Sequence, residues 1–154
     1  IEDKVLAIFD DVKNNGNAAI KQYTLKFDGV ELDDLFVSEE EVVEVEKAIS
    51  TELKEAISIA KNNITAFHAA QKTEKVVVET TVGVECWQEK RPIQKVGLYI
   101  PGGTAPLFST VLMLAIPAKL AGCKEIVLAS PPNKQGKIHP AIFMQRSNVV
   151  LQKL

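Results

Sequence analysis

Residues 96–130 have the sequence VGLYIPGGTAPLFSTVLMLAIPAKLAGCKEIVLAS, and this stretch decides the fold. The β-forming run from Val96 to Ile100 is stopped by Pro101-Gly102-Gly103, which predicts a buried strand followed by a tight turn. From Ser109 the apolar residues follow a helical pattern that ends at a glycine. Glu125 to Ala129 predicts a second strand. Strand, turn, helix and strand in this order predict a βαβ unit with parallel strands and a right-handed crossover.

A ligand of such a sheet binds beyond the carboxyl ends of its strands. The predicted rim of a binding site therefore consists of the residues that follow or end the first strand and begin the helix: Tyr99, Gly102, Gly103, Thr104 and Ser109. Their spacing matches neither the dinucleotide fingerprint G-x-G-x-x-G nor the phosphate loop G-x-x-x-x-G-K-S/T. These standard nucleotide motifs therefore cannot be inferred from the glycines.

The glycines of this turn allow two interpretations. In the first, Gly102 and Gly103 only supply backbone freedom after Pro101, which is the commoner role of such a turn. Alternatively, a turn without side chains lets a ligand approach the backbone N–H groups at the start of the helix. Ser109 and Thr110 are expected to cap that helix, with contact to a ligand as the alternative.

The composition is that of a soluble globular chain with one ordinary domain core, because 46% of the 154 residues are hydrophobic and 25% are charged. Eighteen basic and twenty acidic residues form no basic stripe, which argues against a nucleic-acid partner. The apolar runs are too short for a membrane span, and residues 1–4 lack the features of a secretory signal. Cys86 and Cys123 are far apart in the sequence, so we expect free thiols, with Cys123 buried, in a reducing cytoplasm.

The first half of the chain predicts four helices. Amphipathic patterns over residues 2–14 and around Ile20, Tyr23 and Phe27 predict a helical hairpin, which serves either core packing or a subunit interface. Ser38 and Glu41 predict a capping box, so the EEE cluster at 39–41 is interpreted as a helix start rather than a metal site. Thr51 is expected to cap a helix over residues 52–71. His68, near the end of that helix, is expected to make a local bond or to complement the helix dipole.

Alternating β-forming residues over 75–91 predict a hairpin around Val82-Gly83, with Val76, Val78 and Thr80 on one face. Trp87 is expected to be packed, with a place beside a substrate as the alternative.

Residues 130–136 predict a loop, and His139-Pro140 a further helix start, which residues 145–154 interrupt. Because two parallel strands are too few for a stable sheet, further strands are expected from polypeptide outside this chain or from a partner. The predicted fold class is α/β, with N-terminal helices and a β-hairpin leading into an incomplete Rossmann-like parallel βαβ core. Its predicted segments are 1–74, helical; 75–95, hairpin and connector; and 96–154, the start of the Rossmann-like domain.

Several stretches of the chain resemble the histidinol dehydrogenase family. The strongest is VGLYIPGGTAPLFSTVLMLAIPAKLAGCKEIVLASPP at residues 96–132, and KNNITAFHAAQK at 61–72 and VETTVGVECWQEKRPIQK at 78–95 are similar as well. This resemblance covers residues 1 to about 140. It implies a zinc-dependent homodimer of intertwined subunits that uses two NAD molecules in turn to oxidise histidinol through histidinal to histidine. It also implies that Tyr99 is a dinucleotide contact.

The same resemblance implies that this chain carries none of the chemistry. The family's zinc ligands, its glutamate–histidine acid/base pair and most of its substrate contacts match positions beyond residue 154. The side chains that bind zinc best elsewhere, His68, His139, Cys86 and Cys123, match no family ligand. The sequence after Pro140 departs from the family, and we expect that the chain ends early, through truncation or an altered reading frame near residue 142. The alternative is a stand-alone, non-catalytic α/β binding or regulatory module.

Overall fold

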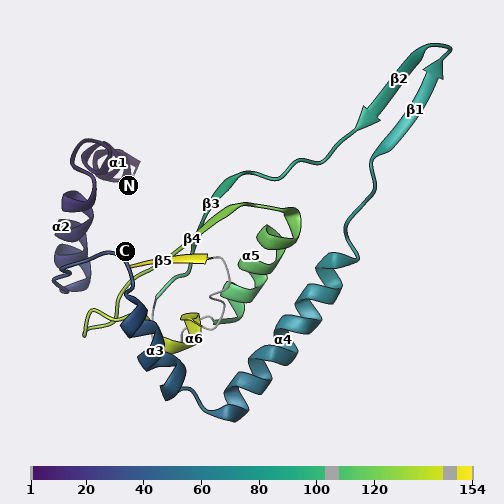
Figure 1. Ribbon diagram of the computed structural model, residues 1–154. Helices are drawn as coiled ribbons and strands as arrows, with labels where there is room; N and C mark the ends of the chain where they lie inside the picture. Colours follow the sequence, from purple (N-terminus) through teal and green to yellow (C-terminus); the bar gives the residue numbers. More distant parts are fainter. Residues whose placement is uncertain (1, 103–107, 144–148, 154) are drawn as a thin grey trace.

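The computed structural model of the protein describes residues 2–102, 108–143 and 149–153 (Figure 1). Within these ranges the chain forms helices first, then a hairpin, then a parallel sheet with its own helices. The helices are α1 (Glu2–Asn15), α2 (Asn17–Asp28), α3 (Glu39–Ala48), α4 (Thr51–Ala69), α5 (Phe108–Ala121) and α6 (Pro140–Phe143). The strands are β1 (Val76–Thr81), β2 (Val84–Gln88), β3 (Lys95–Tyr99), β4 (Glu125–Ser130) and β5 (Val149–Lys153).

The parallel βαβ unit is confirmed, and so is the α/β class. β3 pairs with β4 in parallel, Leu98 lying opposite Leu128, and α5 connects the two strands. The expectation of only two strands was wrong, because β5 pairs in parallel with the other edge of β4. The prediction that residues 149–153 interrupt a helix was incomplete, because Val149 and Val150 are β-branched and favour a strand.

A compact core lies where the sheet meets three helices. It is built from Val42 of α3, Val111 of α5, Leu128 of β4 and Ile142 of α6, together with Ile100 and Ile138. The prediction of a buried first strand was wrong for β3 itself: Ile100, just after it, is 0% exposed, whereas Tyr99 is 58% exposed. The reason is strand order, since β4 is the central strand and β3 lies at an edge of the described sheet.

The N-terminal helical hairpin has the predicted extent but not the expected burial. Gly29 ends α2 in the left-handed conformation with φ 69°, and its N–H donates to the carbonyl of Leu25. No described residue of α1 is buried, and Val5, Leu6 and Phe9 are exposed. Core packing within the described chain is therefore the wrong interpretation for α1.

One predicted helix start is confirmed and another is corrected. Ser38 forms the predicted capping box with Glu41, its Oγ accepting from the Glu41 N–H at 3.2 Å and its own N–H donating to Oε2 at 2.9 Å. Thr51, however, is not a cap. Ser50 holds that position, and its Oγ accepts from the Leu53 N–H at 3.2 Å. Both serines satisfy donors that a helix start leaves unpaired.

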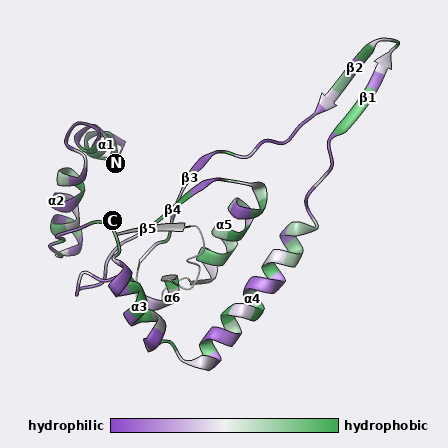
Figure 2. Ribbon diagram, in the orientation of Figure 1, coloured by the Kyte–Doolittle hydropathy of each residue, from purple (hydrophilic) through white to green (hydrophobic). Residues whose placement is uncertain are grey.

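The predicted β-hairpin is confirmed, and it projects away from the rest of the molecule (Figure 1). Every residue of β1 and β2 is exposed, including the apolar segment of β1 that stands out in Figure 2. The expectation that Trp87 is packed was wrong: the side chain is 61% exposed. The ammonium group of Lys75 lies over the Trp87 ring, with Nζ 5.1 Å from the ring centroid.

Two further sequence predictions concern cysteines and membrane spans. Cys86 and Cys123 are free thiols, as predicted, but Cys123 is half-buried rather than buried. Among the described helices, none combines the length and the apolar character that crossing a membrane requires.

Candidate functional site

The carboxyl ends of β3 and β4 enclose a cavity of about 140 Å³. Pro101 and Gly102 line it from the turn after β3, Ser130 and Pro131 from the end of β4, and His139 from the segment before α6. This is the place where parallel sheets of α/β proteins bind ligands. Of the rim residues predicted from the sequence, Gly102 is the one that the structure places in the lining of this cavity.

The two turns that form the cavity approach each other very closely. A Cβ atom at Gly102 would lie 2.9 Å from Cγ of Pro131, which is too short for two carbon atoms. Gly102 does not adopt a positive φ, so its role here is close approach and not backbone freedom. Gly103 and Thr104, the next two residues of the predicted rim, lie outside the described residues.

Ser130 supplies a polar group inside the cavity. The residue is 1% exposed, and its hydroxyl has no hydrogen-bond partner among the residues that the structure describes. A buried hydroxyl without a partner destabilises a protein by roughly 1–3 kcal/mol, so such groups are normally paired with water or a ligand. Ser130 was not among the predicted site residues: its position after a predicted strand indicates the carboxyl edge of the sheet but not its burial.

Tyr99 lies at the last position of β3, opposite Ala129 of β4, beside the residues that line the cavity. The ladder continues for one more bond beyond it, since the Ile100 N–H donates to the carbonyl of Ala129 at 2.8 Å. Tyr99 itself stays exposed and is not part of the cavity wall. A dinucleotide contact at Tyr99 stays a prediction.

The prediction that Ser109 and Thr110 cap α5 was wrong. They are the second and third residues of the helix, which begins at Phe108. Ser109 is exposed and Thr110 is half-buried. The capping position lies before Phe108, outside the described residues.

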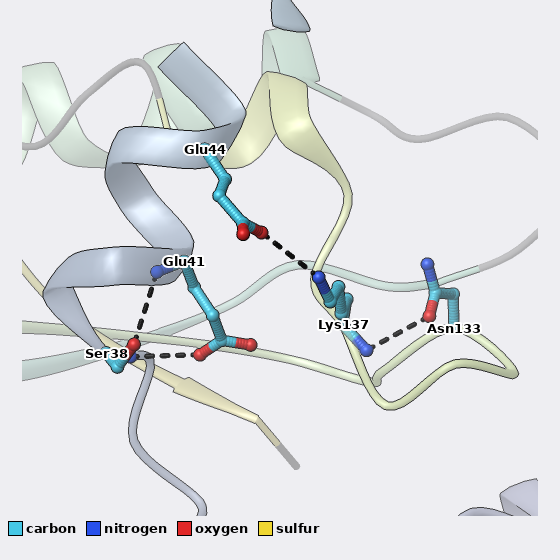
Figure 3. A network of polar contacts seen from close by, with 5 residues as sticks. All are labelled: Ser38, Glu41, Glu44, Asn133 and Lys137. Atoms are coloured by element: carbon cyan, nitrogen blue, oxygen red, sulfur yellow. Dashed lines mark hydrogen bonds and ion pairs between the residues drawn. The ribbon is translucent and has the colours of Figure 1, made fainter. Parts of the chain in front are cut away.

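A polar network holds the loop that forms the far wall of the cavity (Figure 3). Oδ1 of Asn133 accepts from the backbone N–H groups of Gln135 and Lys137, each at 3.0 Å. Nζ of Lys137 pairs with Oε2 of Glu44 at 3.2 Å, which ties the loop to α3. These contacts fix the loop before a ligand arrives, and an Asn after Pro131-Pro132 was a sequence signal for the turn.

The described residues contain no group of three or more His, Cys, Asp or Glu side chains that could hold a metal ion. His68 makes the predicted local bond, with Nδ1 2.8 Å from Oε1 of Gln71. Zinc, which needs three or four converging ligands, does not fit the described part of the chain.

Comparison with known proteins identifies the family. The family model described as histidinol dehydrogenase matches residues 1–153. A histidinol dehydrogenase from Bacteroides fragilis is 57% identical over 141 residues, which are 92% of this chain and 33% of that protein. One from Pasteurella multocida is 56% identical over 132 residues, which are 86% of this chain and 31% of that protein.

The chain belongs to the histidinol dehydrogenase family. A crystal structure of histidinol dehydrogenase from Elizabethkingia anophelis has the same fold, with a TM-score of 0.91 and 49% identity over 98% of this chain and 36% of that one. The chain therefore spans about a third of the length of the histidinol dehydrogenases that it matches.

Proposed function

We propose that this chain is the N-terminal portion of a histidinol dehydrogenase and that it contributes part of the NAD-binding site but none of the reacting groups. Membership of the family supports the proposed activity of the whole protein. One structural observation supports the proposed NAD-binding role of this chain. That observation is the cavity at the carboxyl ends of β3 and β4, whose lining includes Ser130, a buried residue with no side-chain hydrogen bond to another described residue, and which lies next to the exposed strand end at Tyr99.

The chemistry of the whole enzyme follows from the change in its substrate. Oxidation of histidinol to histidinal removes a hydride and a proton. Histidinal then takes up one water molecule, and its hydrate loses a second hydride and proton to give histidine, with NAD as the hydride acceptor in both steps. The residues of this chain act only by binding: Ser130 offers a hydroxyl, Tyr99 offers a flat ring, and Gly102 lets the backbone come close.

The size of the cavity limits what these residues hold. Whole-ligand pockets usually measure 300–1,000 Å³, whereas this cavity measures about 140 Å³. It fits one part of a dinucleotide, so the remaining contacts must come from other polypeptide. We therefore expect weak binding of NAD by this chain alone.

Calorimetric titration of the 154-residue chain with NAD tests the proposal. Loss of one hydrogen bond or one ring contact is worth about 1 kcal/mol, so Tyr99→Ala and Ser130→Ala should each weaken binding about fivefold. Phe67→Ala removes an exposed ring of α4 that lines neither this cavity nor the larger one at the carboxyl end of α4, and serves as the control. If Tyr99→Ala and Ser130→Ala bind NAD as tightly as the unchanged chain, this site is wrong.

Catalysis is the second test. The chain alone should hold no stoichiometric zinc and should form no NADH from histidinol and NAD, measured by absorbance and metal analysis. Turnover by the purified chain would place reacting groups within it, contrary to the proposal. A stand-alone binding module is the less favoured function, because the hairpin and α1 leave apolar side chains exposed.

We also propose that the protein is a cytoplasmic homodimer. The hairpin supports self-association, since its two strands alone do not make a stable unit and its Val77–Trp87 cross-strand pair is exposed. Sedimentation equilibrium should give a mass above the 16.9 kDa of one chain. A well-folded monomer at all concentrations would favour the binding module instead.

A further inference from the structure

A second and larger cavity lies at the other end of α5. It measures about 400 Å³ and is formed by the carboxyl ends of α4 and α5 and by the connector that leads from the hairpin to β3. The 14 residues of α5 span about 21 Å, so this cavity is separate from the one beside Tyr99. Its volume is within the range of small-molecule sites.

One wall of this cavity is cationic. Lys72, Lys90 and Arg91 line it, and none of its lining residues is a carboxylate. Lys72 and Lys90 make no ion pair with any residue that the structure describes, whereas Arg91 pairs with Glu89 at 2.9 Å. In a chain with a net charge of −2, this is a local excess of positive charge. Such an excess attracts anions to a concave surface.

The lining also contains an apolar part, formed by Pro92, Pro117, Leu120 and Ala121, beside the uncharged residues His68, Gln71 and Thr73. Pro92 lies close to Gly122, since a Cβ added at that glycine would be 3.6 Å from Cγ of Pro92. The connector is anchored further at Gln94, whose carbonyl accepts from the N–H groups of Lys124 and Glu125 at 3.1 and 3.0 Å. The cavity therefore exists before any ligand binds.

Helix dipoles explain only part of the cationic wall. Lys72 follows the carboxyl end of α4, where a positive charge is favourable, and its own N–H already bonds the carbonyl of Ala69 at 3.2 Å. Lys90 and Arg91 come from the connector, which is not a helix end. Helix dipoles therefore do not explain why Lys90 and Arg91 line the same cavity as Lys72.

We propose that this cavity binds an organic phosphate of mononucleotide size. Lys72 and Lys90 hold the phosphate, with Arg91 beside them, and the apolar part of the ligand packs on Pro117 and Leu120. The proposal does not depend on the NAD site, because the two cavities lie at opposite ends of α5.

Nuclear magnetic resonance titration with AMP tests the proposal on the 154-residue chain. AMP should cause saturable shifts of the amide resonances of Lys72, Thr73 and Leu120. Inorganic phosphate and adenosine should each bind at least several-fold more weakly, since each has only half of the recognised chemistry. Added salt should weaken AMP binding, because the pairing is electrostatic and exposed.

Two double variants with the same change in charge separate a site from a general charge effect. Lys72→Gln with Lys90→Gln should weaken AMP binding at least tenfold. Lys13→Gln with Lys134→Gln, two exposed lysines outside the cavity, should leave it unchanged. Equal affinity of the two double variants, no saturable shift at Lys72, or shifts confined to Tyr99 and Ser130 would each overturn the proposal.

Discussion

The two β regions of the protein have similar sequences and opposite environments. β1 contains three consecutive valines, yet every residue of the β1–β2 hairpin is exposed. β4 has the comparable sequence EIVLAS, and its Ile126, Leu128 and Ser130 are buried. Both regions form strands because β-branched and aliphatic residues favour extended backbone. What differs is the number of covering elements: α5 and two neighbouring strands for β4, none in the described chain for the hairpin.

This difference shows that a β-forming sequence specifies a strand but not its burial. The hairpin depends on its own pairing, whereas β4 belongs to a core shared with α3, α5 and α6. Substitutions in the two regions should therefore have very different effects on the free energy of unfolding.

The largest effect is expected in β4. Leu128 is 0% exposed, so Leu128→Ala should lower the free energy of unfolding by about 3 kcal/mol through lost burial and a cavity. Val78→Ala, in the hairpin that is exposed within one chain, should change it by less than about 0.5 kcal/mol at protein concentrations where the chain is monomeric. Urea unfolding followed by circular dichroism measures both. Equal losses would mean that the hairpin is covered in solution.

The second largest loss of stability is expected in the turn after β3, which lines the cavity of about 140 Å³. Gly102→Ala places a Cβ 2.9 Å from Cγ of Pro131 and should destabilise the protein by about 1–3 kcal/mol. Gly97→Ala is the matched control in β3, where nothing lies within 4 Å of the new Cβ, and should be neutral or slightly stabilising. A neutral Gly102→Ala, measured by thermal unfolding, would show that the two turns separate easily.

A smaller effect is expected at the start of α3, which joins the sheet-side core through Val42. Ser38→Ala removes an acceptor from the helix N-terminus and should reduce stability by about 1 kcal/mol. Ser38→Asp keeps an acceptor and should retain most of the stability. If Ser38→Ala unfolds like the unchanged chain, the capping box contributes nothing to the core.

The smallest effect is a pH dependence in the exposed N-terminal helices. Hydrogen bonds from Asn15 and from Tyr23 lower the pKa of Asp11 below its ordinary value of 3.8, and the bond to Asp11 raises the pKa of Tyr23 above 10.0. The stability that ionised Asp11 contributes is therefore lost as pH falls through its lowered pKa. The stability that protonated Tyr23 contributes is lost as pH rises through its raised pKa. The α1–α2 contact should be strongest between these limits.

Carbon resonances of the Asp11 carboxyl group, followed through a pH titration, measure this dependence directly. Tyr23→Phe should raise the pKa of Asp11 part of the way towards its ordinary value of 3.8. Asn15→Ala should raise it further, because the hydrogen bond from Asn15 is the larger cause of the lowered pKa. An unchanged pKa in both variants would mean that these hydrogen bonds do not form in solution.

Local sequence patterns predicted the helices and strands of this protein well, because the formation of these elements depends mainly on residues that are close in sequence. The βαβ unit, the hairpin and the Ser38–Glu41 capping box depend on residues close in sequence. Burial does not: Trp87 and Tyr99 are exposed because of what lies around them in space. The pairing of β5 with β4 was missed for the same reason. The division into segments 1–74, 75–95 and 96–154 stays a prediction.

The candidate site was only partly predictable. The position of Tyr99 followed from strand order and from the family resemblance. Ser130 and the close approach of Gly102 to Pro131 required coordinates, because they depend on two turns that are far apart in sequence. The cationic cavity between α4, α5 and the connector was invisible for the same reason.

The composition of the main core has a consequence for synthesis on the ribosome. Its members range from Val42 to Ile142, so no early part of the nascent chain can complete it. Contacts between residues so distant in sequence slow folding, because the intervening chain must be ordered first. The valines of β1 are exposed in the hairpin and are not part of that core, so they stay uncovered throughout synthesis of the chain, and such exposed apolar segments favour aggregation of incomplete chains.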